Sequence, residues 1–534
     1  MGTNGKVALL SVYNKTGIVE FARGLVEMGW QLIASGGTAK VLTEAGIKVR
    51  DVADLVGGGA ILGHRVVTLS REIHAGLLAT DSPKDVTELA SLGIPRIDLV
   101  CVDMYPLEEA IAKDGATLES VIDMTDIGGP TMLRVAAKGR RIVVCDAEDR
   151  QGVLEWLRAD RPNEETFLRG LAARAEYVVA RYVATSAAYL GQGDYTALFG
   201  ESATALCYGE NKRQRAELFG LEGSLDDPLA LHQFNLVEGG TPSFINYADV
   251  HRALETATRI AAGYERNFGF VPRLAVGVKH GNACGAASHG SVSHVTCRMV
   301  AGDPEAISGG VVLVNFPVDE NIAYHLRRHE TSGEQRRILD IVVAPSFTDG
   351  AIEELARRKT GKCRLFVNPA LGELGLKSLD TGPRFRQVRG GFLRQDGDPF
   401  VLPLVLEWQL GEWERSDLLL AWAIGSSANS NTITLVKDGM LIGQGVGQQS
   451  RVMAAKLAVL RARLCGHSTH GAVAYSDSFF PFSDGPKVLA DAGISAVFAT
   501  SGSVRDEEVA KACKGWGVTL VTLPDAEARG FYGH

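Results

Sequence analysis

The stretch VALLSVYNKTGIVEFARGLVEMGWQLIASGGT, residues 7–38, holds two short apolar runs, and each run ends in a turn of small, polar or glycine residues. The runs are predicted to be strands, and the amphipathic segment between them a helix. Strands that alternate with helices are typical of a parallel sheet covered by helices. Similar apolar runs recur at 99–102 and 142–145, so the sequence predicts an α/β layer from Lys6 to about Cys145.

The chain has 534 residues. Single hydrophobic cores stop growing at roughly 250 to 300 residues, so more than one domain is expected. A helical stretch rich in Ala, Arg and Glu, from about 150 to 200, is expected to bridge two regions. Beyond it, two blocks around 274–294 and 419–484 each contain strands that end in glycine-rich turns. We therefore expect two domains, 1–198 and 199–534.

Composition and charge exclude several classes of protein. Hydrophobic residues make up 46% and charged residues 22%, which is the balance of a globular chain. A net charge of −8 argues against the broad basic surface that nucleic acids require. The first apolar run is too short for a signal peptide, and no later run approaches about 18 apolar residues, so we expect a cytoplasmic protein without membrane contact.

Eight cysteines are scattered along the chain, and no two are spaced as Cys-x-x-Cys. The common zinc and thioredoxin patterns are therefore missing, and we expect no metal. Several cysteines lie within apolar runs, where a reduced and buried thiol is the commonest case.

Two turns at the ends of the first predicted strands suggest an anion site. Residues 35–38, Ser-Gly-Gly-Thr, follow one strand and open a helix, so their backbone amides can hold a phosphate. Ser11, Tyr13, Asn14 and Lys15 follow the other strand, and Lys15 adds a positive charge. Either turn alone is a weak signal, but two turns at adjacent strand ends are what a phosphate site at a switch point requires.

Residues 126–130, Asp-Ile-Gly-Gly-Pro, are predicted to begin a helix, because proline is favoured in the first helical turn. This helix carries Arg134 and Lys138 on one face, while Asp126 lies at its start. A lysine near the helix start, with an acid and a phenol such as Tyr105 nearby, can stabilise an oxyanion and move protons. The alternative is that Lys138 is an ordinary solvated lysine.

The strongest single motif is Lys279-His280-Gly-Asn, which directly follows the apolar run 274–278. Ligand sites in α/β sheets lie beyond strand ends, and histidine is the side chain best suited to proton transfer near neutral pH. An adjacent ammonium favours the neutral, basic form of the imidazole. The pair is a candidate catalytic site, with a purely structural pair as the alternative.

These motifs, in this order, resemble those of the bifunctional AICAR formyltransferase/IMP cyclohydrolase family of purine synthesis. The first 150 residues share its Ser-Val-x-x-Lys-Thr-Gly, Ser-Gly-Gly-Thr, Tyr-Pro and Asp-Ile-Gly-Gly-Pro stretches. The remainder shares a Lys-His-x-Asn-x-Cys-Gly motif and further stretches at 208–211, 340–345, 388–391, 430–431, 445–451, 476–482 and 501–503. The resemblance implies a methylglyoxal-synthase-like doubly wound domain, followed by a larger cytidine-deaminase-like formyltransferase region of two similar subdomains without zinc.

The resemblance also implies roles for individual residues. Formyl transfer from formyl-tetrahydrofolate to AICAR would use His280 as general base, assisted by Lys279 and Asn431. Closure of formyl-AICAR to IMP would use Tyr105, Asp126 and Lys138. The first nucleotide site would include Ser11, Tyr13, Asn14, Lys15, Ser35, Gly36, Gly37, Thr38, Arg65, Thr68, Asp103, Ile127 and Gly128. The second would include Tyr208, Gly309, Asp340, Phe479, Asp484 and Arg529. Arg451, Val452, Ser503 and Val504 would lie on the folate side. A homodimer with sites at its interface is also implied.

This chain departs from the family pattern at several of these positions. Val67 stands where the family has lysine, Asp103 where it has asparagine, and Cys207 where it has arginine. Fewer cations and an added anion would weaken the binding of an anionic nucleotide unless neighbours such as Arg213 compensate. The ending 529–534 is also one residue longer than usual. Two alternatives stay open: a formyltransferase alone, or a weakened nucleotide-binding relative whose first domain is a ligand-binding module.

Overall fold

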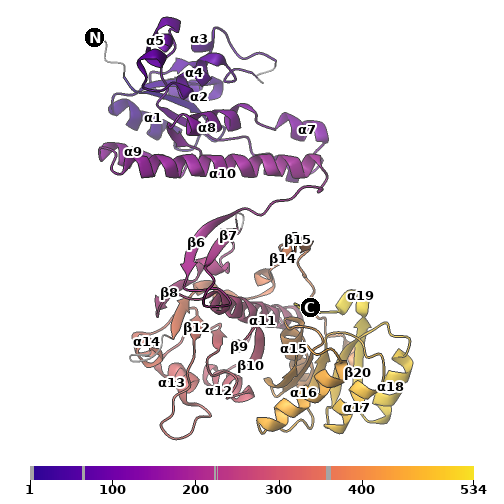
Figure 1. Cartoon of the computed structure of the whole chain (residues 1–534). Helices are drawn as coiled ribbons and strands as arrows, with labels where there is room; N and C mark the ends of the chain where they lie inside the picture. Colours follow the sequence, from indigo (N-terminus) through magenta and orange to yellow (C-terminus); the bar gives the residue numbers. More distant parts are fainter. Residues whose placement is uncertain (1–4, 63–65, 222–223, 225, 357–362, 534) are drawn as a thin grey trace. The chain divides into compact units, whose positions relative to one another are not determined.

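The structure is a computed structural model that describes residues 5–62, 66–221, 224, 226–356 and 363–533. The chain divides into two compact units, Met1–Phe199 and Gly200–His534 (Figure 1). The sequence placed this boundary one residue earlier. Among the described residues, no helix is both long enough and apolar enough to cross a membrane.

The N-terminal unit is built on a five-stranded sheet in which every neighbouring pair is parallel. Its strands are β1 (Val7–Ser11), β2 (Gln31–Ala34), β3 (Arg50–Asp51), β4 (Leu99–Val102) and β5 (Ile142–Val144), in the order β3-β2-β1-β4-β5. The chain winds outward from β1 to β3 and then returns to the other side of β1 with β4. This order confirms the doubly wound fold and places its switch point between β1 and β4.

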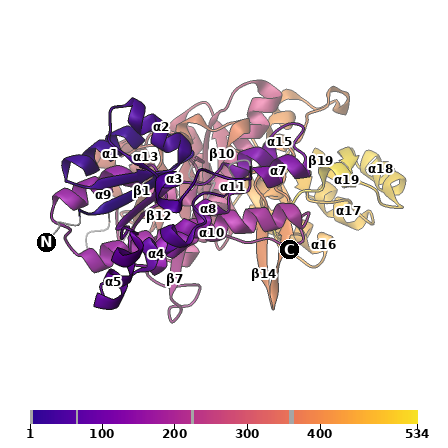
Figure 2. The ribbon, with the colours of Figure 1, turned by 90° about the horizontal axis from the view of Figure 1, so that it is seen from above.

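Helices cover both faces of this sheet. Alternate strand residues point to opposite faces, so Leu10 belongs to one apolar core and Leu9 to the other. The Leu10 core is closed by α1 (Ile18–Glu27), α2 (Gly36–Glu44) and α9 (Asp149–Arg158). The Leu9 core is closed by α3 (Val52–Val56), α4 (Arg71–Leu78), α8 (Gly128–Lys138) and α10 (Glu164–Leu190) (Figure 2). The connections contain α5 (Pro83–Leu92), α6 (Leu107–Ala112) and α7 (Leu118–Asp123).

The C-terminal unit is built on an eleven-stranded mixed sheet, in the order β20-β19-β18-β16-β17-β10-β9-β11-β12-β13-β8. These strands are β8 (Asn235–Glu238), β9 (Arg273–Lys279), β10 (Asn282–His289), β11 (Val311–Val314), β12 (Ile341–Ala344), β13 (Arg364–Val367), β16 (Ile433–Lys437), β17 (Met440–Gly445), β18 (Val473–Ser476), β19 (Ala496–Ser501) and β20 (Thr519–Pro524). Two separate hairpins are formed by β6 (Gly200–Leu206) with β7 (Ala216–Leu221) and by β14 (Arg384–Val388) with β15 (Gly391–Gln395).

The large sheet consists of two halves with the same topology, which agrees with two similar subdomains. Each half has an antiparallel hairpin, β9–β10 or β16–β17, and three strands that are parallel to one another. The eleventh strand, β8, is added antiparallel to β13 at one end of the sheet. The halves meet where β10 pairs antiparallel with β17.

This antiparallel junction brings different ends of the two halves to one edge of the sheet. Because β10 and β17 run in opposite directions, the β9–β10 turn lies at the same edge as the carboxyl ends of β17, β18 and β19. The amino ends of β11, β12 and β16 lie there too. We call this the functional edge, because nearly all the C-terminal residues singled out from the sequence border it.

Helices also cover both faces of the large sheet. One face carries α11 (Phe244–Phe268) and α15 (Glu412–Ser426), which share one core (Figure 1). The other face carries α12 (Val292–Gly302), α13 (Glu320–Arg328) and α14 (Asp349–Leu355) in one half. In the other half it carries α16 (Arg451–Leu464), α17 (Asp484–Asp491) and α18 (Asp506–Gly515).

Candidate active sites

The N-terminal unit has a cavity of about 600 Å³ at the switch point of its sheet. It is lined by Tyr13, Asn14, Lys15, Asp103, Met104, Pro106, Glu109, Cys145, Asp146 and Ala147. These residues follow β1, β4 and β5, and so come from the carboxyl ends of three adjacent strands. Ligands of doubly wound sheets bind at this edge, so the cavity is a candidate nucleotide site.

Hydrogen bonds hold the turns after β1 and β2 against each other. The hydroxyls of Ser11 and Ser35 lie 2.7 Å apart. The Thr38 hydroxyl accepts from the Val12 N–H at 3.1 Å and donates to the Val12 carbonyl at 3.2 Å. The Lys15 ammonium also donates to the Val12 carbonyl, and burial lowers the pKa of Lys15. The structure therefore brings together the two turns that the sequence placed at adjacent strand ends.

Lys15 lies beside the start of α2. Gly36 and Gly37 are the first residues of that helix, and a Cβ added to Gly37 would lie 4.0 Å from Lys15 Cε. The first amides of a helix lack partners within the helix and carry a positive partial charge. Lys15 and the α2 start therefore form one electropositive corner beside the cavity.

Asp103 holds the loop after β1. Its carboxylate accepts the backbone N–H groups of Tyr13 and Asn14, the latter at 3.2 Å. Arg150, whose side chain is 5% exposed, lies 3.6 Å from the same carboxylate. Burial raises the pKa of Asp103, whereas the amide hydrogen bonds and Arg150 act to lower it. The negative charge at this position is thus compensated within the protein by an arginine that sequence reasoning missed.

A second group of expected site residues surrounds the start of α8. Asp126 accepts the Gly129 N–H at 2.9 Å, and its own N–H donates to the Tyr182 hydroxyl at 2.7 Å. A Cβ on Gly129 would lie 2.6 Å from Asp126 Oδ2, and one on Gly128 would lie 2.8 Å from Oγ1 of the buried Thr68. Glycine at both positions therefore allows Asp126 and Thr68 to approach the helix start closely.

Tyr105 connects this group to the cavity. Its ring meets the ring of Tyr13 edge-on, with centroids 5.5 Å apart. Burial raises the pKa of Tyr105, and the nearby charge of Asp126 raises it further. Burial likewise raises the pKa of Asp126. The group thus combines a phenol that stays protonated with a carboxyl group, while Ile127 between Asp126 and the helix is exposed.

Lys138 does not belong to this group, which corrects the expectation that it lies near Asp126 and Tyr105. It is the last residue of α8, and a helix of eleven residues is about 16 Å long. A helix that connects parallel strands begins at the carboxyl edge of the sheet and ends at the amino edge, here where β5 begins. Lys138 is exposed at that opposite edge. The four-residue spacing places Lys138 on the same helix face as Arg134. The direction of the helix, however, decides how far Lys138 lies from Asp126 and Tyr105.

The stretch in which this chain departs most from the family pattern is described only in part. Arg65 lies outside the described residues. Val67 is partly buried and packs against the core that α8 and α10 close. The side chain at the position of the family's lysine is therefore engaged with the core of this unit.

We expect Arg150→Met to destabilise the N-terminal unit by about 3 kcal/mol, because it leaves the largely buried Asp103 carboxylate without its cation. Adding Asp103→Asn should recover part of this loss, since the amide is neutral but can still accept a hydrogen bond. Hydrogen exchange of β1 and β2 peptides in the full-length protein, measured in increasing urea, checks both variants. Equal protection in Arg150→Met and wild type would contradict the role given to this pair.

The C-terminal unit has a cavity of about 550 Å³ at the functional edge. It is lined by Asn431, Gln449, Ser450, Arg451, Val452, Ser478, Phe479, Phe480, Pro481, Phe482, Asp484, Gly485 and Arg529. Six residues singled out from the sequence meet here: Asn431, Arg451, Val452, Phe479, Asp484 and Arg529. They come from the chain before β16, after β17, after β18 and after α19 (Asp525–Ala528), so only the tertiary fold assembles them.

Arg451, the first residue of α16, orients Asn431 in this cavity. Its guanidinium donates to Asn431 Oδ1 at 2.7 Å, to Ser476 Oγ at 3.0 Å and to the fully buried Asp477 carboxylate. Asn431 Nδ2 in turn donates to the Gln448 carbonyl at 2.8 Å. An amide nitrogen carries two N–H donors, so Gln448 takes one of them and fixes the direction of the other.

His280 lies in the tight turn between β9 and β10. His280 and Gly281 both have left-handed backbone conformations, with φ of 54° and 73°. The two carboxylate oxygens of Asp249, on α11, accept the N–H groups of His280 at 3.3 Å and Gly281 at 2.6 Å. A left-handed conformation is unfavourable for a residue with a side chain, so these hydrogen bonds stabilise the turn that presents His280.

Lys279 and two of the expected nucleotide-binding residues lie next to this turn. The Lys279 ammonium donates to the Ser308 carbonyl at 2.6 Å, and a Cβ on Gly309 would lie 3.8 Å from the same ammonium. Asp340 precedes β12, where its N–H donates to the Gly310 carbonyl at 3.0 Å. The structure thus brings Lys279, His280, Gly309 and Asp340 to neighbouring strands of one edge.

The other half of the sheet repeats the turn without the histidine. Asp438 and Gly439, between β16 and β17, have φ of 52° and 71°. Asp417 on α15 accepts their N–H groups at 2.7 and 2.6 Å. Asp249 and Asp417 are each the sixth residue of their helices, and the two turns read Lys-His-Gly and Lys-Asp-Gly. This repetition was the sequence signal that could have identified Asp249.

The residues expected to share one formyltransferase site form two groups along the functional edge. Between β9, which carries Lys279, and β16, which follows Asn431, lie β10 and β17, a separation of about 14 Å at the usual strand spacing. Ser503 and the fully exposed Val504 follow β19, beyond the cavity. Tyr208 lies away from the sheet, where its carbonyl accepts the Phe244 N–H at the start of α11.

Among the described residues, no group of three or more His, Cys, Asp or Glu side chains is arranged to hold a metal ion.

Comparisons with known proteins identify the family of this chain. Residues 17–131 match the model of the MGS-like domain, and residues 136–461 match the model of the AICARFT/IMPCHase bienzyme family. The chain is 37% identical to the bifunctional purine biosynthesis protein PurH of Anoxybacillus flavithermus, over 96% of this chain and 98% of that protein. It is 35% identical to PurH of Bacillus cytotoxicus and 36% identical to PurH of Nostoc punctiforme, each over 97% of this chain and 98% of the relative.

Together with these relatives, the fold defines a two-domain enzyme of purine biosynthesis with a separate candidate site in each unit. The chain belongs to the AICARFT/IMPCHase bienzyme family.

Proposed function

We propose that this chain carries out the last two steps of IMP synthesis. The C-terminal unit transfers the formyl group of formyl-tetrahydrofolate to the amine of AICAR, and the N-terminal unit closes formyl-AICAR to IMP with loss of water. One observation carries this proposal: His280, on a stabilised left-handed turn, lies at the same edge of the sheet as a cavity of about 550 Å³. Membership of the bienzyme family supports the same assignment.

We assign the role of general base in formyl transfer to His280. The amine nitrogen of AICAR forms a bond to the formyl carbon, and the bond from that carbon to the folate nitrogen breaks. His280 takes the proton that the amine loses and returns it to the departing folate nitrogen, so that atoms and charge balance. A positioned base of this kind contributes about 10²–10⁴-fold to the rate.

Other groups of the C-terminal unit are assigned to stabilise charge and hold the substrates. The second Nδ2–H of Asn431 donates to the formyl oxygen as negative charge develops there, and Lys279 supplies positive charge near the base. We assign Tyr208, Gly309, Asp340, Phe479, Asp484 and Arg529 to the nucleotide. Arg451, Val452, Ser503 and Val504 are assigned to the folate side. Arg451 also orients Asn431, so a change at Arg451 affects both substrates.

In the N-terminal unit we assign proton transfer during ring closure to Tyr105 and Asp126. The carboxamide nitrogen bonds to the formyl carbon, and the formyl oxygen leaves as water with one hydrogen from that nitrogen and one from the formylated amine. The protonated Tyr105 hydroxyl donates to the oxygen, and Asp126 accepts a proton. Lys15, the turn 35–38 and the β1 loop hold the phosphate, with Thr68 and Arg65 assigned to the remaining nucleotide.

We further propose a cytoplasmic homodimer in which two chains complete each formyltransferase centre. Support comes from the separation of about 14 Å between the strands that carry Lys279 and Asn431, which exceeds direct hydrogen-bonding distance within one chain. At each centre, one chain would supply Lys279 and the second chain would supply Asn431.

One observation favours a second candidate function, in which the N-terminal unit binds its nucleotide but closes the ring slowly. Val67 packs into the core at the position of the family's lysine, so this unit has fewer cations for an anionic substrate. Assays that measure formyl transfer and ring closure separately distinguish the two functions.

Purified protein supplied with AICAR and formyl-tetrahydrofolate should produce formyl-AICAR and then IMP. His280→Ala should lower formyl transfer by about 10²–10⁴-fold and leave closure of supplied formyl-AICAR unchanged, because the two reactions use different units. His289→Ala, at the other end of the same hairpin, is the control and should retain both activities. If the rate of formyl transfer in His280→Ala stays within a few-fold of wild type, His280 is not the general base.

Ring closure should depend on Asp126 far more than on Lys138. Asp126→Asn should slow the closure of formyl-AICAR by about 10²-fold or more, because a group that moves a proton is lost. Lys138→Met should stay within a few-fold of wild type, since Lys138 is exposed at the opposite edge of the sheet. Steady-state kinetics with supplied formyl-AICAR measure both variants. A larger loss of ring closure in Lys138→Met than in Asp126→Asn would show that Lys138 takes part in the reaction.

Asp249 is proposed as a positioning residue that acts through the His280 turn. Asp249→Asn keeps one acceptor and loses the other, so kcat for formyl transfer should fall about tenfold or more while KM for AICAR changes little. Asp417→Asn removes the same contact from the copy of the turn that lacks histidine, and it should lower thermal stability by a similar amount without changing kcat. Equal losses of kcat in both variants would leave Asp249 with a structural role only.

A further inference from the structure

The last residues of the chain lie along the segment that precedes β16. The Tyr532 N–H donates to the Ala428 carbonyl at 2.9 Å, and the Ser430 N–H donates to the Gly533 carbonyl at 3.1 Å. These bonds form a short parallel pairing in which Asn429 lies opposite Gly533. Residues 529–533 thus form a strap that is attached to the chain immediately before Asn431.

This strap connects two residues of the C-terminal cavity. Arg529 begins the strap and Asn431 follows the segment to which the strap is bound, and both line the cavity. Between them, the Tyr475 hydroxyl donates to the Gly530 carbonyl at 2.9 Å, and Gly530 N–H donates to the Asp477 carbonyl at 3.4 Å. A shift of the strap would therefore move both Arg529 and the loop that carries Asn431.

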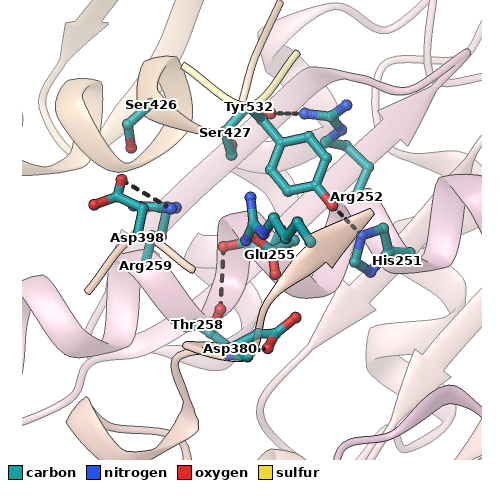
Figure 3. A network of polar contacts seen from close by, with 12 residues as sticks. His251, Arg252, Glu255, Thr258, Arg259, Asp380, Asp398, Ser426, Ser427 and Tyr532 are labelled. Carbon is teal, nitrogen blue, oxygen red and sulfur yellow. Dashed lines mark hydrogen bonds and ion pairs between the residues drawn. The ribbon is translucent and has the colours of Figure 1, made fainter. Parts of the chain in front are cut away.

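Tyr532 anchors the strap to the other half of the unit. Its ring lies between two guanidinium groups, with the centre of Arg252 at 3.9 Å and that of Arg384 at 4.3 Å from the ring centroid. Its hydroxyl is hydrogen bonded to His251 Nε2 (Figure 3). His251 and Arg252 come from α11, and Arg384 begins β14. Three side chains from two elements therefore surround one tyrosine, in an arrangement we call the tyrosine clasp.

The groups of the clasp are held in place by their own partners. Arg384 pairs with Glu255 at 2.7 Å, and Arg252 donates to the Ser427 carbonyl, next to the segment that binds the strap. Burial raises the pKa of Tyr532 and lowers the pKa of His251. Near neutral pH both groups are therefore uncharged, so the hydrogen bond joins a neutral phenol to a neutral imidazole.

We propose that Tyr532 is a positioning residue for formyl transfer: the tyrosine clasp holds the C-terminal strap so that Arg529 and Asn431 face the same cavity. The proposal rests on the formyltransferase function proposed above. Residues of α11 and β14 would thus help to position two groups of a cavity that neither element lines. The stacked guanidinium groups supply the anchorage, because a cation over an aromatic ring is attracted more strongly when water is excluded.

The test compares Tyr532→Ala with Tyr532→Phe in the full-length protein. Tyr532→Ala should raise KM for AICAR in formyl transfer by about tenfold, since the ring and both cation contacts are lost. Tyr532→Phe keeps the stacked ring and should stay within a few-fold of wild type. Amide hydrogen exchange in peptides covering 428–431 should become faster in Tyr532→Ala, which reports strap release independently of activity. Ring closure of supplied formyl-AICAR should not change, because it occurs in the other unit.

The matched control is Trp516→Ala, which removes another aromatic ring beneath a cation, at 5.6 Å from Lys487, away from the strap. It should change neither KM for AICAR nor exchange at 428–431. Wild-type KM and exchange in Tyr532→Ala, or equal effects in Trp516→Ala, would overturn the positioning role. If the wild type transfers no formyl group, the proposed function and the positioning role are both overturned. If the wild type is active and Tyr532→Ala is unaffected, only the positioning role is overturned.

Discussion

The antiparallel pairing of β10 with β17 is the constraint on which the C-terminal site depends. If the two halves met through parallel strands, the β9–β10 turn and the carboxyl ends of β17 and β18 would lie at opposite edges of the sheet. The observed pairing brings them to one edge. Duplication of one topology therefore yields a single edge with two different features: a tight turn that presents His280, and a cavity lined by polar and aromatic side chains.

Carboxylates that are partly or fully buried hold loops in both units. Asp249 and Asp417 each bind two amides of a left-handed turn, and Asp103 binds two amides of the β1 loop. An acceptor with two oxygens can satisfy two neighbouring N–H groups at once, and charge strengthens each hydrogen bond. Burial opposes this by disfavouring the ionised form, which is why Asp103 also needs Arg150. Asp103, at the candidate nucleotide site, thus serves the backbone, and its presence does not by itself argue against an anionic ligand.

Much of the fold and part of each site could be predicted from sequence. The apolar runs predicted β1, β2, β4 and β5, and the turns after β1 and β2 do meet, because parallel strands present their carboxyl ends to one edge. The Lys138 expectation failed in position. Spacing along a helix reports which face a residue shares, but it carries no information on which edge of the sheet the far end of that helix reaches.

The partners of the site residues were not predictable in the same way. Arg150 lies 47 positions from Asp103, and Tyr532 lies 281 positions from His251, so no local pattern joins them. The sequence by itself determined the alternation of strands and helices, the glycine turns and the chemical identity of the candidate groups, because these depend on neighbours along the chain. Only the tertiary structure decided which groups meet, which acids pair with arginine and which residues the C-terminal tail contacts. Those contacts depend on strand order and helix direction, and these are settled when the separate segments pack together.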